Sequence, residues 1–511
     1  MKRIIYSIAV LLAAVSCIQD LDQAPRTKSD ASQVYSTTEG YKAVLAKLYA
    51  SFVIAGQEQG GSDADLDSNE GHDFLRGYIN LQEAPTDEMA PTWLSGDDMT
   101  DLAYMTWDAN DPWVTDTYYR LYYTISLCNE FISHAASSND ADVALYCKEA
   151  RFLRALAYWY VLDLFGQGPF VDETMGVGAY TPECYDGKQL FSFVEGELKD
   201  IELEPKGSTE YGRAPRAAVW ALLSRLYLNA EVYGAGDHYS DCIEYCKKVI
   251  ADGYTLEGTY TKLFNASNNK RTNEIIFPFV VDGTNTVSWG ATTYLVCGEL
   301  GNDNTQDGAL FGVDSKWGMF RARGEFTALF DSPDGRALFW TADSSQYLDK
   351  AIDDQSNGWF VEKWSNLTDD GEAASSVATS GASIDFPVFR LAEIYLTAAE
   401  AVLRGGLGLS VEDVLGYVNK LRFRAYGDSS GKIAEDALTL DFILDERARE
   451  LYWECSRRTD LVRYGRFSGG DYIWQWKGGV KDGTATDSRF DVYPIPDLEC
   501  SANPNITNKN Y

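Results

Sequence analysis

The sequence predicts a mainly α-helical protein, in which helical hairpins of the tetratricopeptide type form a scaffold for long irregular loops. Apolar residues recur at helical spacing toward both ends of the chain, and segments such as 220–223 and 391–403 alternate small with large apolar residues. Small residues let a neighbouring helix approach closely, as in stacked helical hairpins. Between these parts, 254–386 is rich in Gly, Asn, Asp, Ser and Thr, a composition that favours loops.

The individual helices follow from the same spacing. In 149–165, apolar residues occupy nearly the whole circumference, which predicts a helix buried on almost all sides. The sequence GQGP at 166–169 ends this helix, because glycine terminates helices and proline cannot continue them. Further helices are expected, in chain order, at 39–54, 117–136, 188–203, 215–232, 239–251, 387–404, 411–426 and 440–455.

The chain has 511 residues, 45% of them hydrophobic, which is enough for a sizeable buried core. We predict one domain over 17–511, whose helical scaffold covers about 35–252 and 387–467. A loop-rich binding region is expected at about 55–115 and 254–386, because long loops on a helical scaffold usually carry function.

The N-terminus is predicted to be a targeting signal rather than part of the fold. Lys2 and Arg3 precede an apolar run that ends in small residues before Cys17, which is typical of a secretory signal over 1–16. The ending AVSC at 14–17 resembles a bacterial lipobox, whose cysteine becomes the lipidated first residue of the mature protein. We therefore expect a lipoprotein anchored through Cys17 at the outer membrane and facing the cell surface; plain secretion is the alternative.

The charge balance excludes several partners. There are 44 basic and 77 acidic residues, a net charge of −33, so neither nucleic acid nor anionic lipid is an expected electrostatic partner. Eight cysteines follow Cys17 without the spacing of a redox pair or a zinc site. The three histidines are far apart in the sequence, which argues against histidine-based metal chemistry.

No enzyme motif is present: the sequence lacks GxSxG, HExxH, a Walker loop and a GxGxxG that leads into a helix. Carboxylate pairs such as Asp87-Glu88 and Asp97-Asp98 are expected by chance among 77 acidic residues, and are better interpreted as solvated surface than as a hydrolase site. The aspartates of 94–116 could hold calcium, but no EF-hand loop is present. We expect a protein without a catalytic role and without a cofactor.

Several long segments resemble the SusD/RagB family of outer-membrane nutrient-binding lipoproteins. The segment 149–170, EARFLRALAYWYVLDLFGQGPF, is similar to a hallmark helix of that family. Further similar segments are 212–233, 386–404, 446–467 and the YPIP ending at 493–496, and three loops (85–88, 293–298 and 472–479) resemble a starch-binding member of the family. The resemblance implies a SusD-like helical fold, glycan binding without hydrolysis, and a partner that is a TonB-dependent outer-membrane transporter of the SusC type.

The resemblance also implies a binding site. In the starch-binding member, three aromatic rings form an arc that follows the curve of an α-1,4-glucan. By local motif these rings fall on Trp93, Tyr294 and Trp317, and Arg76 matches an arginine that binds sugar hydroxyls. Flat rings suit a neutral sugar because they stack on its C–H faces.

This sequence departs from that pattern in places that affect specificity. Pro91 replaces a further tryptophan, and the segment that holds Asp97 replaces a polar asparagine, so that Asp97 is a candidate contact. The side chain that faces Arg76 is either Asn69 or Glu70. We expect a starch-like α-glucan ligand; a different polysaccharide, or a peptide if the aromatic loops are buried, is the alternative, and a glycan hydrolase is the least favoured.

Overall fold

The long helices predicted from the sequence are present in the computed structural model, which describes residues 31–56, 65–66, 72–176, 178, 180–302, 304–376, 381–508 and 511. The signal 1–16, the lipidation candidate Cys17 and the site candidate Asn69 lie outside these residues. The helices are α2 (Ala31–Val34), α3 (Thr38–Ala50), α4 (Phe74–Glu83), α5 (Thr100–Tyr104), α6 (Pro112–Ala135), α7 (Ala141–Phe165), α8 (Gly187–Asp200), α9 (Arg216–Leu228), α10 (Tyr239–Ala251), α11 (Ala291–Gly298), α12 (Gly324–Thr327), α13 (Leu391–Leu403), α14 (Val411–Tyr426), α15 (Leu440–Leu451), α16 (Arg457–Arg463) and α17 (Asp497–Ala502).

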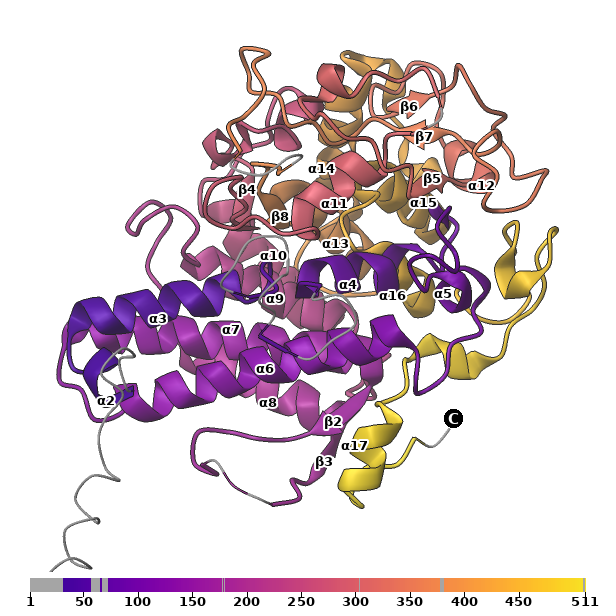
Figure 1. Ribbon diagram of the computed structural model, residues 1–511. Coiled ribbons are helices and arrows are strands. Elements are labelled where there is room, and N and C mark those ends of the chain that lie inside the picture. The colour runs from indigo at the N-terminus through magenta and orange to yellow at the C-terminus, as the bar shows by residue number, and fades with distance from the viewer. Residues whose placement is uncertain are drawn as a thin grey trace, which may run out of the picture.

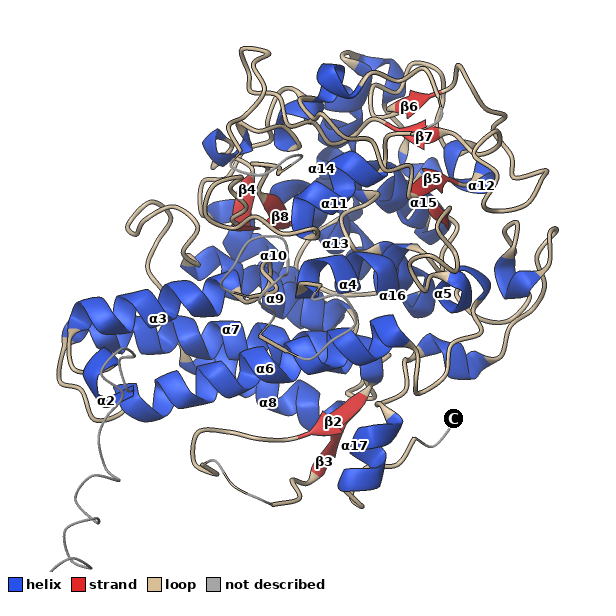
Figure 2. Ribbon diagram, viewed as in Figure 1, coloured by secondary structure: helices blue, strands red, loops and turns tan. Residues whose placement is uncertain are grey.

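Helix packing follows the apolar pattern. Helix α7 begins at the N-cap Asp140, whose carboxylate accepts backbone N–H groups, and it ends at Gly166, whose φ of 66° suits glycine. Helices α3, α6, α7 and α8 lie side by side, whereas α9, α10, α13 and α14 pack in succession (Figures 1 and 2). Buried small residues such as Ala217, Ala218 and Ala221 on α9 allow the close approach predicted for tetratricopeptide-type hairpins.

Strands are short and pair in twos. They are β1 (Met89–Pro91) with β5 (Phe320–Ala322), β2 (Gln167–Pro169) with β3 (Cys184–Asp186), β4 (Ile275–Phe279) with β8 (Phe386–Arg390), and β6 (Phe339–Trp340) with β7 (Phe360–Val361), all antiparallel.

The structure corrects two features predicted from the sequence. The helix expected at 387–404 begins only at Leu391, because 386–390 forms strand β8 against β4. The regions expected to be irregular contain the helices α4, α5, α11 and α12. Every residue of α4 and of α11 is buried.

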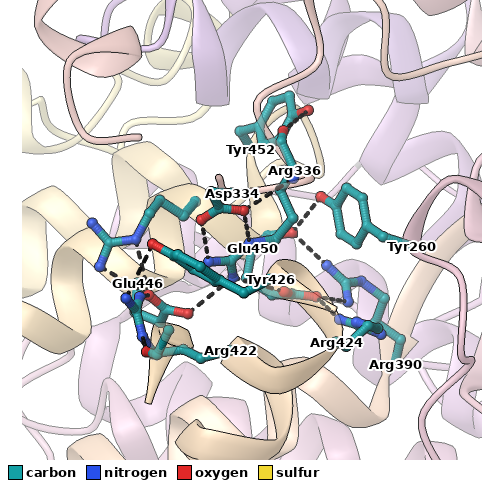
Figure 3. Close-up of polar contacts among 12 residues, drawn as sticks. Tyr260, Asp334, Arg336, Arg390, Arg422, Arg424, Tyr426, Glu446, Glu450 and Tyr452 are labelled. Atoms are coloured by element: carbon teal, nitrogen blue, oxygen red, sulfur yellow. Dashed lines mark hydrogen bonds and ion pairs between the residues drawn. The ribbon is translucent and has the colours of Figure 1, made fainter. Parts of the chain in front are cut away.

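A fully buried ionic cluster joins the loop region to the C-terminal helices (Figure 3). The carboxylate of Glu450 on α15 accepts hydrogen bonds from Arg390 (2.6 Å), from Arg424 and from Arg336 (3.0 Å). Arg336 comes from the segment before β6 and also binds Glu446 (2.9 Å). Burial alone would raise the pKa of Glu446, but Arg336 and the other arginines around it lower that pKa to about 2. The cluster therefore holds the segment before β6 against α14 and α15.

The eight described cysteines, at positions 128, 147, 184, 242, 246, 297, 455 and 500, form no disulfide with one another. In the described part of the chain no helix has the length and hydrophobicity required to span a bilayer. The same residues contain no group of three or more His, Cys, Asp or Glu side chains arranged to hold a metal ion.

Candidate functional site

Arg76, in the first turn of α4, is at the centre of the candidate site. One of its Nη atoms donates to both carboxylate oxygens of Asp97 (2.8 and 3.0 Å), and the other donates to the carbonyl oxygen of Trp289 (2.9 Å). Only 5% of Arg76 is exposed, and the Asp97 side chain is similarly buried. This pair therefore joins three segments that are distant in the sequence: α4, the loop after β1, and the turn before α11.

Two buried rings cover the Arg76 guanidinium. Its central carbon lies 4.4 Å from the centre of the Tyr294 ring and 5.2 Å from that of Trp113. The hydroxyl of Tyr294 donates to Asn80 on α4 (2.7 Å), and only 1% of Tyr294 is exposed. The expectation that Tyr294 presents an exposed ring from a loop is therefore wrong, because the residue belongs to the buried helix α11.

Trp93 and Trp317 lie at one end of the β1–β5 ladder. Pro91 pairs with Phe320, and the N–H of Thr92 donates to the carbonyl oxygen of Met319 (2.7 Å). Because antiparallel strands run in opposite directions, the residues that follow β1 lie beside those that precede β5. Trp93 is 42% exposed and Trp317 is half-buried. The ladder thus brings together two of the three rings that the sequence predicts, with ring surface open to solvent.

Trp317 is held in place by its neighbours. Its backbone N–H donates to the carbonyl oxygen of Cys297 at the end of α11 (2.8 Å), and its indole Nε1 donates to the hydroxyl of Ser315 (3.1 Å). The centres of the Trp317 and Trp289 rings are 6.2 Å apart, and the two ring planes are inclined by 55°.

Trp289, which is 46% exposed, is an aromatic residue at this site that the sequence analysis missed. A signal was available, because Trp289 stands between Ser288 and Gly290 in a stretch poor in other large apolar residues. Binding residues lie disproportionately on loops, so an exposed tryptophan on a loop is a candidate for function.

Among the described residues, the acidic partner of Arg76 is Asp97; the expected Asn69 and Glu70 lie outside those residues. Asp97 was expected as a glycan contact, whereas its carboxylate binds Arg76 and its carbonyl oxygen accepts the indole N–H of Trp113 (2.8 Å). Asp97 and Arg76 therefore support the surface that the tryptophans form.

The carboxylate pair Asp87-Glu88 is structural, and it is buried rather than part of the solvated surface expected from the sequence. Asp87 accepts two hydrogen bonds from Arg457 (2.7 and 2.6 Å) and both carboxylates are buried. Glu88 lies against Glu83. The pKa of Glu88 is raised well above its usual value, mainly by burial and next by the negative charge of Glu83. Carboxylates enclosed in this way have no surface on which a sugar could bind.

Two cavities lie apart from the tryptophans. A groove of about 990 Å³ runs between α14 and the segment 254–258, and its lining includes Phe423 and Lys420. A smaller, mainly apolar cavity of about 310 Å³ lies between α3 and β4. None of Trp93, Trp289 and Trp317 lines either cavity.

Comparison with known proteins agrees with this architecture. A model of the SusD family matches residues 335–511. The chain is 34% identical to the "Starch-binding protein SusD" of Bacteroides thetaiotaomicron, over 99% of this chain and 97% of that protein. It is 21% identical to a "SusD-like protein" of Bacteroides ovatus, over 95% of this chain and 87% of that protein.

Solved structures share the fold. A SusD-like protein from Bacteroides fragilis superimposes with a TM-score of 0.69 at 22% identity, covering 95% of this chain and 99% of that one. Surface glycan-binding protein A from Bacteroides thetaiotaomicron, in complex with laminarihexaose, gives 0.70 at 19% identity, covering 93% and 99%. Similarity at this level of identity establishes the fold, and the match to SusD along nearly the whole chain establishes more: the chain belongs to the SusD family.

Proposed function

We propose that this protein is a cell-surface glycan-binding lipoprotein that captures starch-like α-glucan oligosaccharides for import, without hydrolysing them and without a cofactor. The observation that carries the proposal is the pair Trp93 and Trp317, two tryptophans with ring surface open to solvent at one end of the β1–β5 ladder. Support for starch-like glucan as the ligand comes from the 34% identity to a protein named for starch binding.

The chemistry of the surface suits a neutral sugar. A sugar offers hydroxyl groups and patches of C–H, and indole faces stack on those patches. Arg76 and Asp97, which hold the Trp289 carbonyl and the loop after β1, are paired with each other, so neither offers an unpaired charge to a ligand. A peptide was the alternative if the aromatic loops were buried, and the exposure of Trp93 and Trp289 disfavours it.

Import requires a partner in the membrane. We propose that a SusC-type TonB-dependent transporter receives the glycan, and that lipid on Cys17 holds the protein beside it at the outer membrane. Co-purification from outer membranes in mild detergent is expected to recover a protein of the size of a large β-barrel transporter. Isolation only as a free lipoprotein would contradict the partnership.

Alanine variants of the tryptophans test the glycan site. Stacking on one indole contributes roughly 1 kcal/mol or more beyond area burial, and about 1.4 kcal/mol corresponds to a tenfold change in affinity. Trp317→Ala and Trp93→Ala are therefore expected to weaken binding to amylose about tenfold in affinity electrophoresis, with little change in melting temperature. The control is Tyr180→Ala, which removes an exposed ring from the connection between β2 and β3.

Three outcomes would contradict the proposal in different ways. Unchanged affinity in both tryptophan variants would show that the glycan does not bind at these tryptophans. If the wild-type protein binds a flat β-linked glucan and does not bind amylose, the proposal of glycan binding stands and the assignment of starch as the ligand is wrong. New reducing ends after overnight incubation with starch, lost on mutation of one Asp or Glu, would make the protein a hydrolase.

A further inference from the structure

Trp289 and Trp317 form a pair of inclined indoles on the open surface of the molecule. Their ring centres are 6.2 Å apart and their planes are inclined by 55°. Trp289 is 46% exposed, so part of its side chain is open to solvent. Among the described residues, the indole of Trp289 makes no ion pair, no hydrogen bond and no ring contact other than the one with Trp317.

The backbone that carries Trp289 is firmly held. Arg76 donates to its carbonyl oxygen (2.9 Å), and the hydroxyl of Ser288, the preceding residue, donates to Asp73 (2.6 Å). A Cβ atom at Gly290 would overlap the carboxylate of Asp73, and Ala291 adopts a φ of 45°, which is rare for a residue other than glycine.

The positive φ of Ala291 has an energetic cost and a consequence for binding. A non-glycine residue with positive φ persists only where the surroundings enforce it, and such strain is concentrated at functional sites. The turn therefore holds the Trp289 backbone in one position before any ligand arrives, which lowers the ordering cost of binding.

Tyr294, the ring expected in the arc, is not available for stacking. The Arg76 guanidinium lies over its ring at 4.4 Å, and the edge of Phe320 contacts it at a ring-centre distance of 5.0 Å. Its hydroxyl is bound to Asn80. A sugar could reach this ring only if α11 moved away from α4.

We infer that Trp289 replaces Tyr294 as an aromatic ring of the glycan platform, and that Trp289 and Trp317 together select α-linked glucans whose successive sugars are inclined to each other. This inference rests on the proposed function. Rings 6.2 Å apart are too close to hold a sugar between them, so each supports a different sugar along the chain. A curved α-glucan presents successive sugars at changing angles and contacts both rings. A flat β-1,4-glucan presents its sugars in one plane and contacts one ring at a time.

The test compares Trp289→Ala, Trp317→Ala and Tyr294→Phe with the wild type. A cyclic α-glucan, linear malto-oligosaccharides and a cello-oligosaccharide serve as probes in titration calorimetry. Trp289→Ala is expected to weaken binding of both α-glucans about tenfold or more and to reduce the preference for α- over β-linked probes. Tyr294→Phe keeps the buried ring and is expected to change affinity less than twofold. Trp289→Phe keeps a flat face and should restore part of the loss.

The outcomes separate this inference from the proposed function. If Trp317→Ala weakens binding and Trp289→Ala leaves it within twofold, the role of Trp289 is refuted and the glycan site stands. If neither variant changes binding, the proposed function fails as well. If Trp289→Phe loses as much affinity as Trp289→Ala while both melt at the wild-type temperature, stacking is not the contribution of this residue and the inference is overturned.

Discussion

Replacement of Glu450 by glutamine should strongly destabilise the protein while leaving the tryptophan surface intact. The Glu450 carboxylate is fully buried and accepts hydrogen bonds from the guanidinium groups of Arg336, Arg390 and Arg424 (Figure 3). Glutamine keeps the shape of the side chain, but it replaces one acceptor oxygen with an N–H donor that faces guanidinium donors. It also removes the one negative charge that these three cations share.

The magnitude follows from the burial. Removal of one partner from a buried ion pair costs about 3–5 kcal/mol, because the remaining charge stays desolvated. Folded proteins are stable by only about 5–15 kcal/mol, so the variant should lose a large part of that margin. For a domain of this size the unfolding entropy is roughly 1 kcal/mol/K, so the melting temperature should fall by about 3–5 °C.

The assay is urea unfolding followed by circular dichroism, together with a thermal melt. The matched control is Glu435→Gln, since Glu435 is exposed and makes no ion pair among the described residues; it should change stability by less than about 0.5 kcal/mol. Affinity for amylose of the folded variant should equal that of the wild type, because the cluster is separate from Trp93, Trp289 and Trp317. A loss below about 1 kcal/mol for Glu450→Gln would refute the argument that this cluster is dry and tightly coupled.

Two further predictions concern titration and anchoring. Burial raises the pKa of Glu83 to about 7, above its unfolded value, so the folded state retains a proton that the unfolded state loses. Stability should therefore fall as pH rises from about 4.5 to 7, at up to about 1.4 kcal/mol per pH unit. Glu83→Gln should remove this dependence. If urea unfolding gives the variant and the wild type parallel pH profiles, the prediction is wrong. Cys17→Ala should release the protein from the membrane fraction, since a lipid on Cys17 is the anchor proposed here; unchanged partition in cells that lack the transporter would show a different anchor.

The helical scaffold could be predicted in detail because its apolar periodicity is local. The expected bounds of α10 (239–251) and α14 (411–426) coincide with those of the structure. Helices α4 and α11 are short, with ten and eight residues, and lie in segments whose composition favours loops, so they were not predicted. Strand β8 was taken for the first turn of a helix, since its partner β4 is more than a hundred residues away and pairing at that distance leaves no local pattern.

The candidate site could be predicted only in part, for a related reason. Trp93 and Trp317 were placed through motif resemblance, and both have ring surface at the site. Tyr294 lies beside the apolar residues Leu295 and Val296, a context that indicates burial more than exposure. Trp289 has polar and glycine neighbours and no local apolar partner, but its proximity to Trp317 depends on how the chain folds.

The positions of Arg76 and the tryptophans indicate a division of roles within the site. A side chain that holds the surface in place is buried and bound to its neighbours, as Arg76 is to Asp97 and to the Trp289 carbonyl. A side chain that contacts a sugar must keep a free face, as Trp289 does. Because the carbonyl of Trp289 is bound by the same guanidinium that binds Asp97, the position of the exposed ring depends on the buried ion pair. A change in the buried layer would therefore alter folding and recognition together, whereas a change in an exposed indole would alter recognition alone. Specificity for a different glycan can then arise by substitution of the exposed rings, while α4, α11 and their ion pair stay the same.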